Sequence, residues 1–238
     1  MFSVVFPGQG SQVVGMGKLF YEKYDLVKNY FKEADETLNF PLSKVILDGP
    51  KSELDLTFNT QPAIFLISYS IFNVIKKEFN INLNKAEFFA GHSLGEYSAL
   101  SCAGYMKFSD TIKILKIRGE AMQTAVPKGI GGMVAILGST IKIIEEMIDS
   151  NKNNFNIQIA NDNSDGQIVV SGKLIDLDRF IEILKLKKIK NIKLPVSAPF
   201  HCELMNNATK IMEEEINKID FAKGYNVLMS NVTADKIK

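Results

Sequence analysis

The sequence contains few of the residues that most often hold metal ions or form disulfides. Its 238 residues include two cysteines, Cys102 and Cys202, and two histidines, His92 and His201. Two cysteines are too few for a disulfide scaffold, so we expect a reducing, cytoplasmic setting. The two histidines are far apart in the sequence and belong to no H-E-x-x-H motif. We therefore expect no metal site.

The chain also lacks an excess of charge of either sign. Its 28 lysines and arginines are balanced by 27 aspartates and glutamates, which leaves a net charge of +1. A domain that binds nucleic acid usually carries a clustered basic excess, so the composition excludes this class from our expectations. Because 46% of the residues are hydrophobic, the chain can bury a core and does not resemble a disordered protein.

Long hydrophobic runs are missing too. The longest, Pro62–Ile75, is interrupted by Ser68, Ser70 and Asn73. It is shorter than the roughly 20 residues that a membrane-spanning helix needs, and so it predicts a core helix. The N-terminus has no basic segment followed by an apolar stretch, so we expect no signal peptide and no membrane association.

Segments of strand-like and helix-like pattern alternate through the first half of the chain. We predict strands at 2–6 and 86–90 and helices at 16–24, 25–38, 59–79, 94–103 and 109–125. This alternation is typical of an α/β domain with a largely parallel sheet. The chain is long enough for one large domain that carries a smaller one.

The pattern changes after Lys128. We predict strands at 133–137, 155–160, 167–171 and 190–196 and helices at 141–150 and 174–187. The order β-α-β-β-α-β is typical of a ferredoxin-like domain, and the turn-forming residues at 161–166 predict its hairpin connection. We therefore expect a ferredoxin-like small domain at 128–196. It would be inserted into a large α/β-hydrolase-like domain with a parallel sheet, formed by 1–127 and 197–238.

The strongest chemical signal is the G-x-S-x-G pentapeptide at 91–95. It lies between a predicted strand and a predicted helix, which is the setting of a nucleophile elbow. Glycines allow the sharp turn that exposes Ser93 Oγ, and the helix that follows offers N–H groups to a developing oxyanion. A glycine-flanked turn whose serine only caps the helix would be the simpler alternative. We interpret Ser93 as a catalytic nucleophile.

A serine nucleophile needs a base, and only two histidines are available. His92 is adjacent to Ser93 on the turn, where neighbouring side chains diverge, so a structural role suits it better. His201 follows Pro199 and Phe200 at the point where the chain re-enters the large domain. Elimination favours His201 as the base.

Arg118 is a further candidate. It borders the apolar face of the helix predicted at 109–125 and is followed by Gly119. Most helical arginines lie in solvent, but an arginine beside an apolar face can offer its planar guanidinium to a carboxylate.

Five motifs together suggest a family. They are F-P-G-Q-G-S-Q at 6–12, T-Q-P-A at 60–63, G-H-S-L-G-E-Y at 91–97, R-G at 118–119 and P-F-H at 199–201. In this order they closely resemble the malonyl-CoA:acyl-carrier-protein transacylases of bacterial-type fatty acid biosynthesis. The resemblance extends from residue 2 to about residue 233, which makes it far more specific than G-x-S-x-G alone.

The resemblance implies a ping-pong acyl transfer that needs no cofactor. Ser93, activated by His201, would attack malonyl-CoA, and the malonyl group would then pass to the phosphopantetheine thiol of acyl carrier protein. The backbone N–H groups of Gln9 and Leu94 would form the oxyanion hole. Arg118 would bind the free malonyl carboxylate.

The resemblance also implies a longer chain. Family members continue for some tens of residues past the position of Lys238, and a glutamine carbonyl in that extension orients the catalytic histidine. Two alternatives remain open from the sequence. One is a serine esterase or thioesterase, since several acidic residues lie between Ser93 and His201. The other is a shortened homologue that binds carrier protein without turnover.

Overall fold

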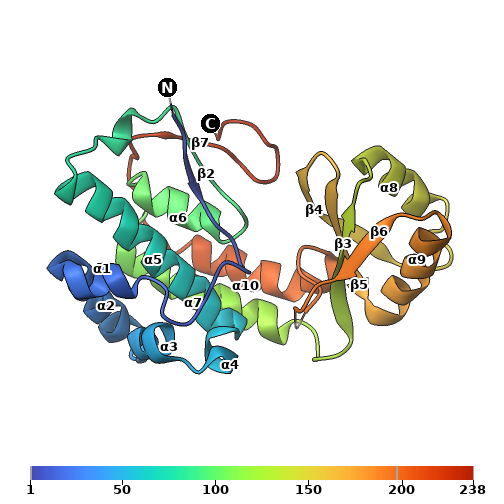
Figure 1. Cartoon of the computed structure of the whole chain (residues 1–238), viewed down its shortest axis with the longest axis horizontal. Coiled ribbons are helices and arrows are strands. Elements are labelled where there is room, and N and C mark those ends of the chain that lie inside the picture. Colours follow the sequence, from blue (N-terminus) through green and yellow to red (C-terminus); the bar gives the residue numbers. More distant parts are fainter. Residues whose placement is uncertain (1, 197, 238) are drawn as a thin grey trace. The chain divides into compact units, whose positions relative to one another are not determined.

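The computed structural model describes residues 2–196 and 198–237. They form two compact units, each with its own sheet (Figure 1). The first unit comprises Met1–Glu120 and Met212–Lys238, and the second comprises Ala121–Ile211. The chain is thus a mixed α/β protein with a parallel sheet in one unit and an antiparallel sheet in the other. The alternating pattern of the first half predicted the parallel sheet.

A small parallel sheet lies at the centre of the first unit. Its strands are β1 (Val4–Phe6), β2 (Phe88–Gly91) and β7 (Val227–Leu228), and β2 is the middle strand. Val5 is paired with Ala90, and Phe89 with Leu228. The aromatic rings of Phe6 and Phe89 pack together beneath the sheet with ring centroids 6.1 Å apart. This sheet ends where the G-x-S-x-G motif begins.

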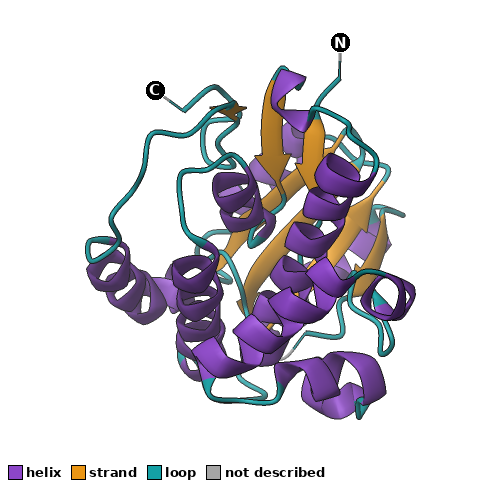
Figure 2. Ribbon diagram, turned by 90° about the vertical axis from the view of Figure 1, so that its left-hand side faces the viewer, coloured by secondary structure: helices purple, strands orange, loops and turns teal. Residues whose placement is uncertain are grey.

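Helices surround this sheet (Figure 2). They are α1 (Lys18–Lys23), α2 (Asp25–Leu38), α3 (Leu42–Asp48), α4 (Lys51–Leu54), α5 (Thr57–Glu78), α6 (Gly95–Cys102) and α7 (Phe108–Thr124). A further helix, α10 (Asn206–Ile216), begins in the second unit and ends in the first. Short 3-10 turns occur at Leu83–Lys85 and Glu203–Met205. No helix in the part of the chain that the structure describes is both long and apolar enough to cross a membrane.

The core of the first unit follows from helical periodicity. Val27, Phe31 and Ala34 are spaced so that they share one face of α2, and all three are buried. They pack with buried residues of α5 and α7, including Phe65 and Ile112. The apolar run predicted as a core helix is therefore the middle of α5, as expected.

The second unit contains one antiparallel sheet. Its elements are β3 (Gly131–Leu137), α8 (Ile141–Asp149), β4 (Ile157–Ser164), β5 (Gln167–Lys173), α9 (Leu174–Leu186) and β6 (Lys190–Lys193). The strand order is β4-β5-β3-β6. Along β3, Val134 and Ile136 face the core beneath α8 and α9, whereas Met133 and Ala135 face a second cluster on the other side. Both faces of the sheet are therefore covered.

The hairpin connection predicted at 161–166 is mostly strand. β4 continues to Ser164, with Asn161 paired to Val169 and Asp162 to Ile168, and the turn is reduced to Asp165 and Gly166. The end of β4 projects into solvent. Neither face of this part of β4 is buried, so its strand positions do not require apolar side chains and can hold polar, turn-forming residues.

The compact second unit extends beyond the predicted range 128–196 on both sides. Ala121 and Met122 at the end of α7 pack with Ala198 and Phe200 against the sheet face that carries Met133. Ser197, where we predicted the large domain to resume, lies outside the described residues. The insertion of a domain at 128–196 stays a prediction.

Candidate functional site

Ser93 lies on a sharp turn between β2 and α6. Its backbone φ is 52°, in the left-handed region that residues other than glycine rarely adopt. A Cβ on Gly91 would lie 1.9 Å from the carbonyl carbon of Gly95, and a Cβ on Gly95 would lie 2.5 Å from the carbonyl oxygen of Phe6. Only glycine fits at either position, so the two glycines of the motif allow strand, turn and helix to approach this closely.

Backbone hydrogen bonds hold the turn. His92 N–H donates to Phe6 O at 3.0 Å, and Gly95 N–H donates to His92 O at 2.9 Å. Leu94 is almost fully buried and precedes the first turn of α6. N–H groups at the start of a helix have no acceptor within the helix and carry its positive dipole end, so this region can stabilise an anion.

The loop that contains Gln9 lies against this turn. A Cβ on Gly8 would be 2.5 Å from His92 Nδ1 and 2.8 Å from His92 O, so the loop and the turn are in direct contact. Beyond Gln9, the N–H of Gly10 donates to Gln12 Oε1 at 2.8 Å. Gln9 thus follows a residue that contacts His92, and Leu94 follows Ser93 in the sequence.

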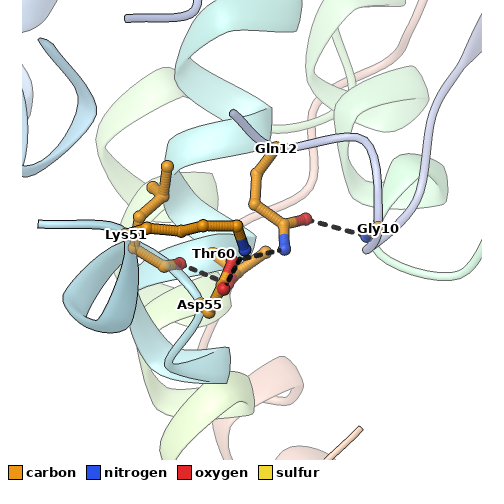
Figure 3. A network of polar contacts seen from close by, with 6 residues as sticks. Gly10, Gln12, Lys51, Asp55 and Thr60 are labelled. Atoms are coloured by element: carbon orange, nitrogen blue, oxygen red, sulfur yellow. Dashed lines mark hydrogen bonds and ion pairs between the residues drawn. The ribbon is translucent and has the colours of Figure 1, made fainter. Parts of the chain in front are cut away.

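The same loop is attached to α4 and α5 through a polar network (Figure 3). Gln12 Nε2 donates to Asp55 Oδ1 at 3.0 Å, and Lys51 forms an ion pair with the same carboxylate. Hydrogen bonds from Lys51 and Gln12 lower the pKa of Asp55, so its carboxylate is ionised at neutral pH. Thr60 Oγ1, at the start of α5, donates to Leu54 O at 2.5 Å. The position of Gln9 is therefore fixed from both sides of its loop.

Arg118 contacts the predicted nucleophile directly. Its Nη2 donates to Ser93 Oγ at 3.1 Å, and its Nη1 donates to Gln61 Oε1 at 2.7 Å. The guanidinium also lies over the ring of Tyr97, with Cζ 5.6 Å from the ring centroid. Arg118 and Ser93 are 25 positions apart in the sequence, and the structure brings their side chains together.

Burial and neighbouring groups shift the pKa of Arg118 in opposite directions. Desolvation lowers the pKa of Arg118, whereas Tyr97 and Glu96 raise it. An arginine remains protonated at neutral pH even after a moderate decrease of its pKa. At Glu96, burial raises the pKa and is the largest effect, while Asn231 and Arg118 lower it. The site thus holds a cation whose hydrogen-bond partners are neutral oxygens.

His201 belongs to the second unit. It is exposed, its φ is 58°, and it follows the buried Phe200. Next to it, Cys202 Sγ donates to Pro199 O at 3.1 Å. Ser93 belongs to the first unit, and so the Ser93–His201 pair stays a prediction. His92 is exposed and lies against Gly8 in the loop of Gln9, and its structural role stays a prediction.

Sequence reasoning missed two residues of this site. Gln61 is buried and accepts a hydrogen bond from Arg118, although we had used it only as part of a family motif. Asn231 lies 138 positions after Ser93 and accepts a hydrogen bond from its N–H. No local pattern could have indicated either contact, because each joins segments that are distant in the sequence.

Metal ligands do not gather in this site. Among residues 2–196 and 198–237, no group of three or more His, Cys, Asp or Glu side chains could hold a metal ion. Cys102 is buried, and burial raises the pKa of its thiol well above the usual range, so it remains a neutral, packed side chain at neutral pH. This geometry offers a partly buried serine hydroxyl that lies beside a guanidinium and the start of a helix.

Known sequences similar to this chain are acyl transferases. Residues 3–235 match the family model described as acyl transferase domain. The malonyl CoA-acyl carrier protein transacylase of Bacillus subtilis (strain 168) is 43% identical over 233 residues. These residues cover 97% of this chain and 72% of that protein.

Solved structures give the same result. The acyl-carrier-protein-S-malonyltransferase from Bartonella henselae superposes with a TM-score of 0.95 at 40% identity, covering 100% of this chain and 76% of that one. A malonyl-transacylase in complex with a type II PKS acyl-carrier protein superposes with a TM-score of 0.94 at 34% identity, again covering 100% and 76%. The mixed α/β fold with its two sheets is the fold of these proteins.

Proposed function

The chain belongs to the acyl transferase domain family, and from that premise we propose that it transfers a malonyl group from coenzyme A to acyl carrier protein in fatty acid biosynthesis. The observation that carries the proposal is the 3.1 Å contact between Arg118 Nη2 and Ser93 Oγ. It places a cation beside a hydroxyl on a strained turn, and a malonyl thioester has a free carboxylate close to its reactive carbonyl. An unsubstituted acyl thioester has no group that would use this arginine.

We propose two half-reactions with a covalent intermediate. In the first, His201 takes the proton of Ser93 as Oγ attacks the malonyl thioester carbon; the C–S bond breaks, and coenzyme A leaves as a thiol with that proton. In the second, the phosphopantetheine thiol of the carrier protein attacks the malonyl-serine ester. The C–O bond breaks, and Ser93 regains its proton through His201.

Charge develops on the carbonyl oxygen in both half-reactions. We assign its stabilisation to the backbone N–H groups of Gln9 and Leu94, because the loop of Gln9 contacts the turn and Leu94 stands at the start of α6. Loss of one such donor typically lowers the rate by about 10²–10³-fold. The structure adds a reason for the rigidity of this loop, namely the network of Gln12, Lys51 and Asp55.

We extend the proposal to the two units. A nucleophile elbow at the end of a parallel strand supports an α/β-hydrolase-like description of the first unit. The succession β3-α8-β4-β5-α9-β6 and the strand order β4-β5-β3-β6 support a ferredoxin-like description of the second. The boundaries 1–127, 128–196 and 197–238 remain our prediction for the large and small domains.

The predicted partners are malonyl-CoA and an acyl carrier protein, in the cytoplasm, and no cofactor is required. A structural relative was solved in complex with its acyl-carrier protein, which supports the second partner. All groups assigned to the reaction are side-chain or backbone atoms of the chain itself. Coenzyme A enters bound to the substrate and leaves as a product.

The first half-reaction can be tested by mass. After brief mixing with malonyl-CoA, the intact protein should gain one malonyl group, about 86 Da, because a serine nucleophile retains the acyl group as an ester. The Ser93→Ala variant should gain nothing. Ser52→Ala, which changes an exposed serine of α4, is the matched control and should be labelled like the unaltered chain.

The outcomes separate the alternatives. Labelling of Ser93→Ala at the normal rate would contradict the nucleophile assignment. Release of free coenzyme A without an adduct, at equal rates with and without carrier protein, would favour a thioesterase. Carrier-protein binding with neither adduct nor thiol release would identify a binding protein and overturn the proposed transfer.

A further inference from the structure

The chain forms a compact loop directly after β7. We call residues 229–237 the C-terminal loop. Met229 and Lys236 form an antiparallel bridge, and Ser230 N–H donates to Asp235 O at 2.9 Å. Ser230 Oγ also accepts the N–H groups of Val232 and Thr233 at 3.1 and 3.3 Å. Asn231 is therefore presented by an ordered loop that is anchored to the parallel sheet.

Asn231 bonds to both sides of the turn that carries Ser93. Its Nδ2 donates to Gly91 O at 2.6 Å, and its Oδ1 accepts the N–H of Ser93 at 2.8 Å. Its own N–H donates to Glu96 Oε1 at 3.4 Å. The side-chain amide thus bridges the residue before His92 and the residue after it, which are the two ends of the turn.

An amide suits this position for a chemical reason. The turn offers one acceptor, Gly91 O, and one donor, Ser93 N–H, side by side. A planar side-chain amide has a donor and an acceptor on the same carbon and so satisfies both, and asparagine and glutamine carry this group. An aspartate could do so only in its protonated form.

The backbone conformation of Ser93 needs such support. A φ of 52° is unfavourable for a residue with a Cβ, so the turn persists only where its surroundings over-determine it. The hydrogen bond to Asn231 also occupies the N–H of Ser93. The next N–H along the chain, that of Leu94, then remains for the oxyanion, in agreement with the assignment made above.

We propose that Asn231 is a positioning residue for the nucleophile: its side-chain amide holds Ser93 in the left-handed conformation that directs Oγ toward Arg118 and the substrate. The proposal rests on the function proposed for Ser93. Asn231 itself touches neither the acyl group nor the proton that moves. Its loss should leave the fold in place and reduce the rate at which Ser93 is acylated.

The test compares two asparagines of the same segment. Asn226 Nδ2 donates to Asn84 O and Ala86 O, at 3.0 and 3.1 Å, so Asn226→Ala removes a similar pair of hydrogen bonds away from the turn. We expect Asn231→Ala to acylate about 10-fold or more slowly with saturating malonyl-CoA, since small displacements of a reacting atom have effects of this size. Asn226→Ala should lower the melting temperature and leave the acylation rate unchanged.

The pH dependence of acylation in Asn231→Asp is a second test. A residue that only stabilises the fold would not produce this dependence. At neutral pH its carboxylate accepts from Ser93 N–H but repels Gly91 O, which lies 2.6 Å from Nδ2 in the unaltered chain. When protonated, it can donate to Gly91 O again. We therefore compare the acylation rate of Asn231→Asp with that of the unaltered chain at the same pH. The ratio of the two rates should rise as the pH is lowered.

These experiments distinguish failure of the positioning role of Asn231 from failure of the function proposed for Ser93. Equal acylation rates for Asn231→Ala and the unaltered chain would overturn the positioning role, and so would equal slowing of Asn231→Ala and Asn226→Ala. If the unaltered chain and Ser93→Ala both remain unlabelled, the proposed function fails. Amide hydrogen exchange of Ser93 then tests the positioning role on its own: the role requires faster exchange in Asn231→Ala than in Asn226→Ala, and equal exchange rejects it.

Discussion

At the scale of single residues, Arg118 is a partly buried cation that donates to two neutral oxygens; burial lowers its pKa, whereas the charge of Glu96 raises it. The guanidinium of Arg118 donates to Ser93 Oγ and Gln61 Oε1 and lies over the ring of Tyr97. Removing a charge from water is unfavourable unless an opposite charge compensates it. In the function proposed above, a malonyl carboxylate binds this guanidinium directly, so we expect an acidic acyl group to be favoured over a neutral one.

Arg118→Ala tests this preference. Charge-assisted hydrogen bonds contribute roughly 1.5–3 kcal/mol, so malonyl transfer should fall by about 10- to 150-fold. Acetyl transfer should be spared or improved, because an acetyl group has no carboxylate and gains from a less polar pocket. Initial rates with malonyl-CoA and acetyl-CoA measure both effects.

Arg179→Ala is the matched control for this variant. Arg179 lies on α9 with an exposed side chain and donates to Asn154 O, so its loss should affect neither rate. A parallel fall of malonyl and acetyl transfer in Arg118→Ala would show that Arg118 supports the turn of Ser93 without selecting the acyl group.

At the scale of elements, Arg118 depends on a close contact between two helices. The next residue, Gly119 on α7, faces Phe58 on α5: a Cβ there would lie 2.3 Å from Phe58 Cα and 2.7 Å from its nitrogen. Backbone atoms cannot move aside as a flexible side chain can. The glycine therefore sets how near α7 comes to α5, and with it the reach of Arg118 to Gln61.

Gly119→Ala should be destabilising although alanine is the better helix former. Alanine gains about 1 kcal/mol from helix propensity, but overpacking costs about 1–3 kcal/mol or more, and backbone contacts are at the upper end of that range. We expect a lower melting temperature and slower malonyl transfer. Lys113→Ala, at an exposed position of α7, should change neither. An unchanged melting temperature in Gly119→Ala would show that α7 shifts at no cost.

Elements with a strong periodic pattern could be predicted from the sequence, and short ones could not. The bounds of α2 agree with the prediction because a clear apolar face of four turns lies between Asp25 and Leu38. The short α3 and α4, with 7 and 4 residues, offer too few turns to show a period, and β7 has only 2 residues. Their positions are set by tertiary packing.

Some residues of the candidate site have a signal in the sequence, and others have none. Ser93 could be proposed from the local G-x-S-x-G pattern, and Arg118 mainly from the family resemblance, and the roles of both stay predictions. Gln61 and Asn231 could not, because their roles depend on contacts across 57 and 138 positions of the chain. Sequence patterns reveal the residues that carry the chemistry more readily than those that orient them.

At the scale of the whole molecule, each of the two units has hydrophobic clusters of its own. In the first unit Phe31, Phe65 and Leu115 are among the residues buried together, and in the second unit Phe180 packs on Phe155 with ring centroids 5.4 Å apart. The two clusters share no residue. Each unit therefore has the apolar contacts that an independently stable region needs.

Phe180→Ala should unfold the second unit preferentially. Removing a fully buried phenylalanine typically costs about 3–5 kcal/mol, a large part of the stability of a region of this size. Hydrogen exchange followed by mass spectrometry should show faster exchange at 131–193, with α2 and α5 still protected. Phe79→Ala, at an exposed position, is the control. Equal loss of protection in α2 and α5 would show that the molecule unfolds as one cooperative unit.

The contact between Ser93 and Asn231 also has a consequence during synthesis. A ribosome adds about 5–20 residues per second, so the 138 positions between the two residues take roughly 7 to 30 seconds to translate. Until the C-terminal loop emerges, β2 has no β7 beside it, and the amide that bridges the turn is absent. The nascent chain thus carries its serine in a turn without this amide, and its reactivity toward thioesters should reach the full rate only after the C-terminal loop has been translated.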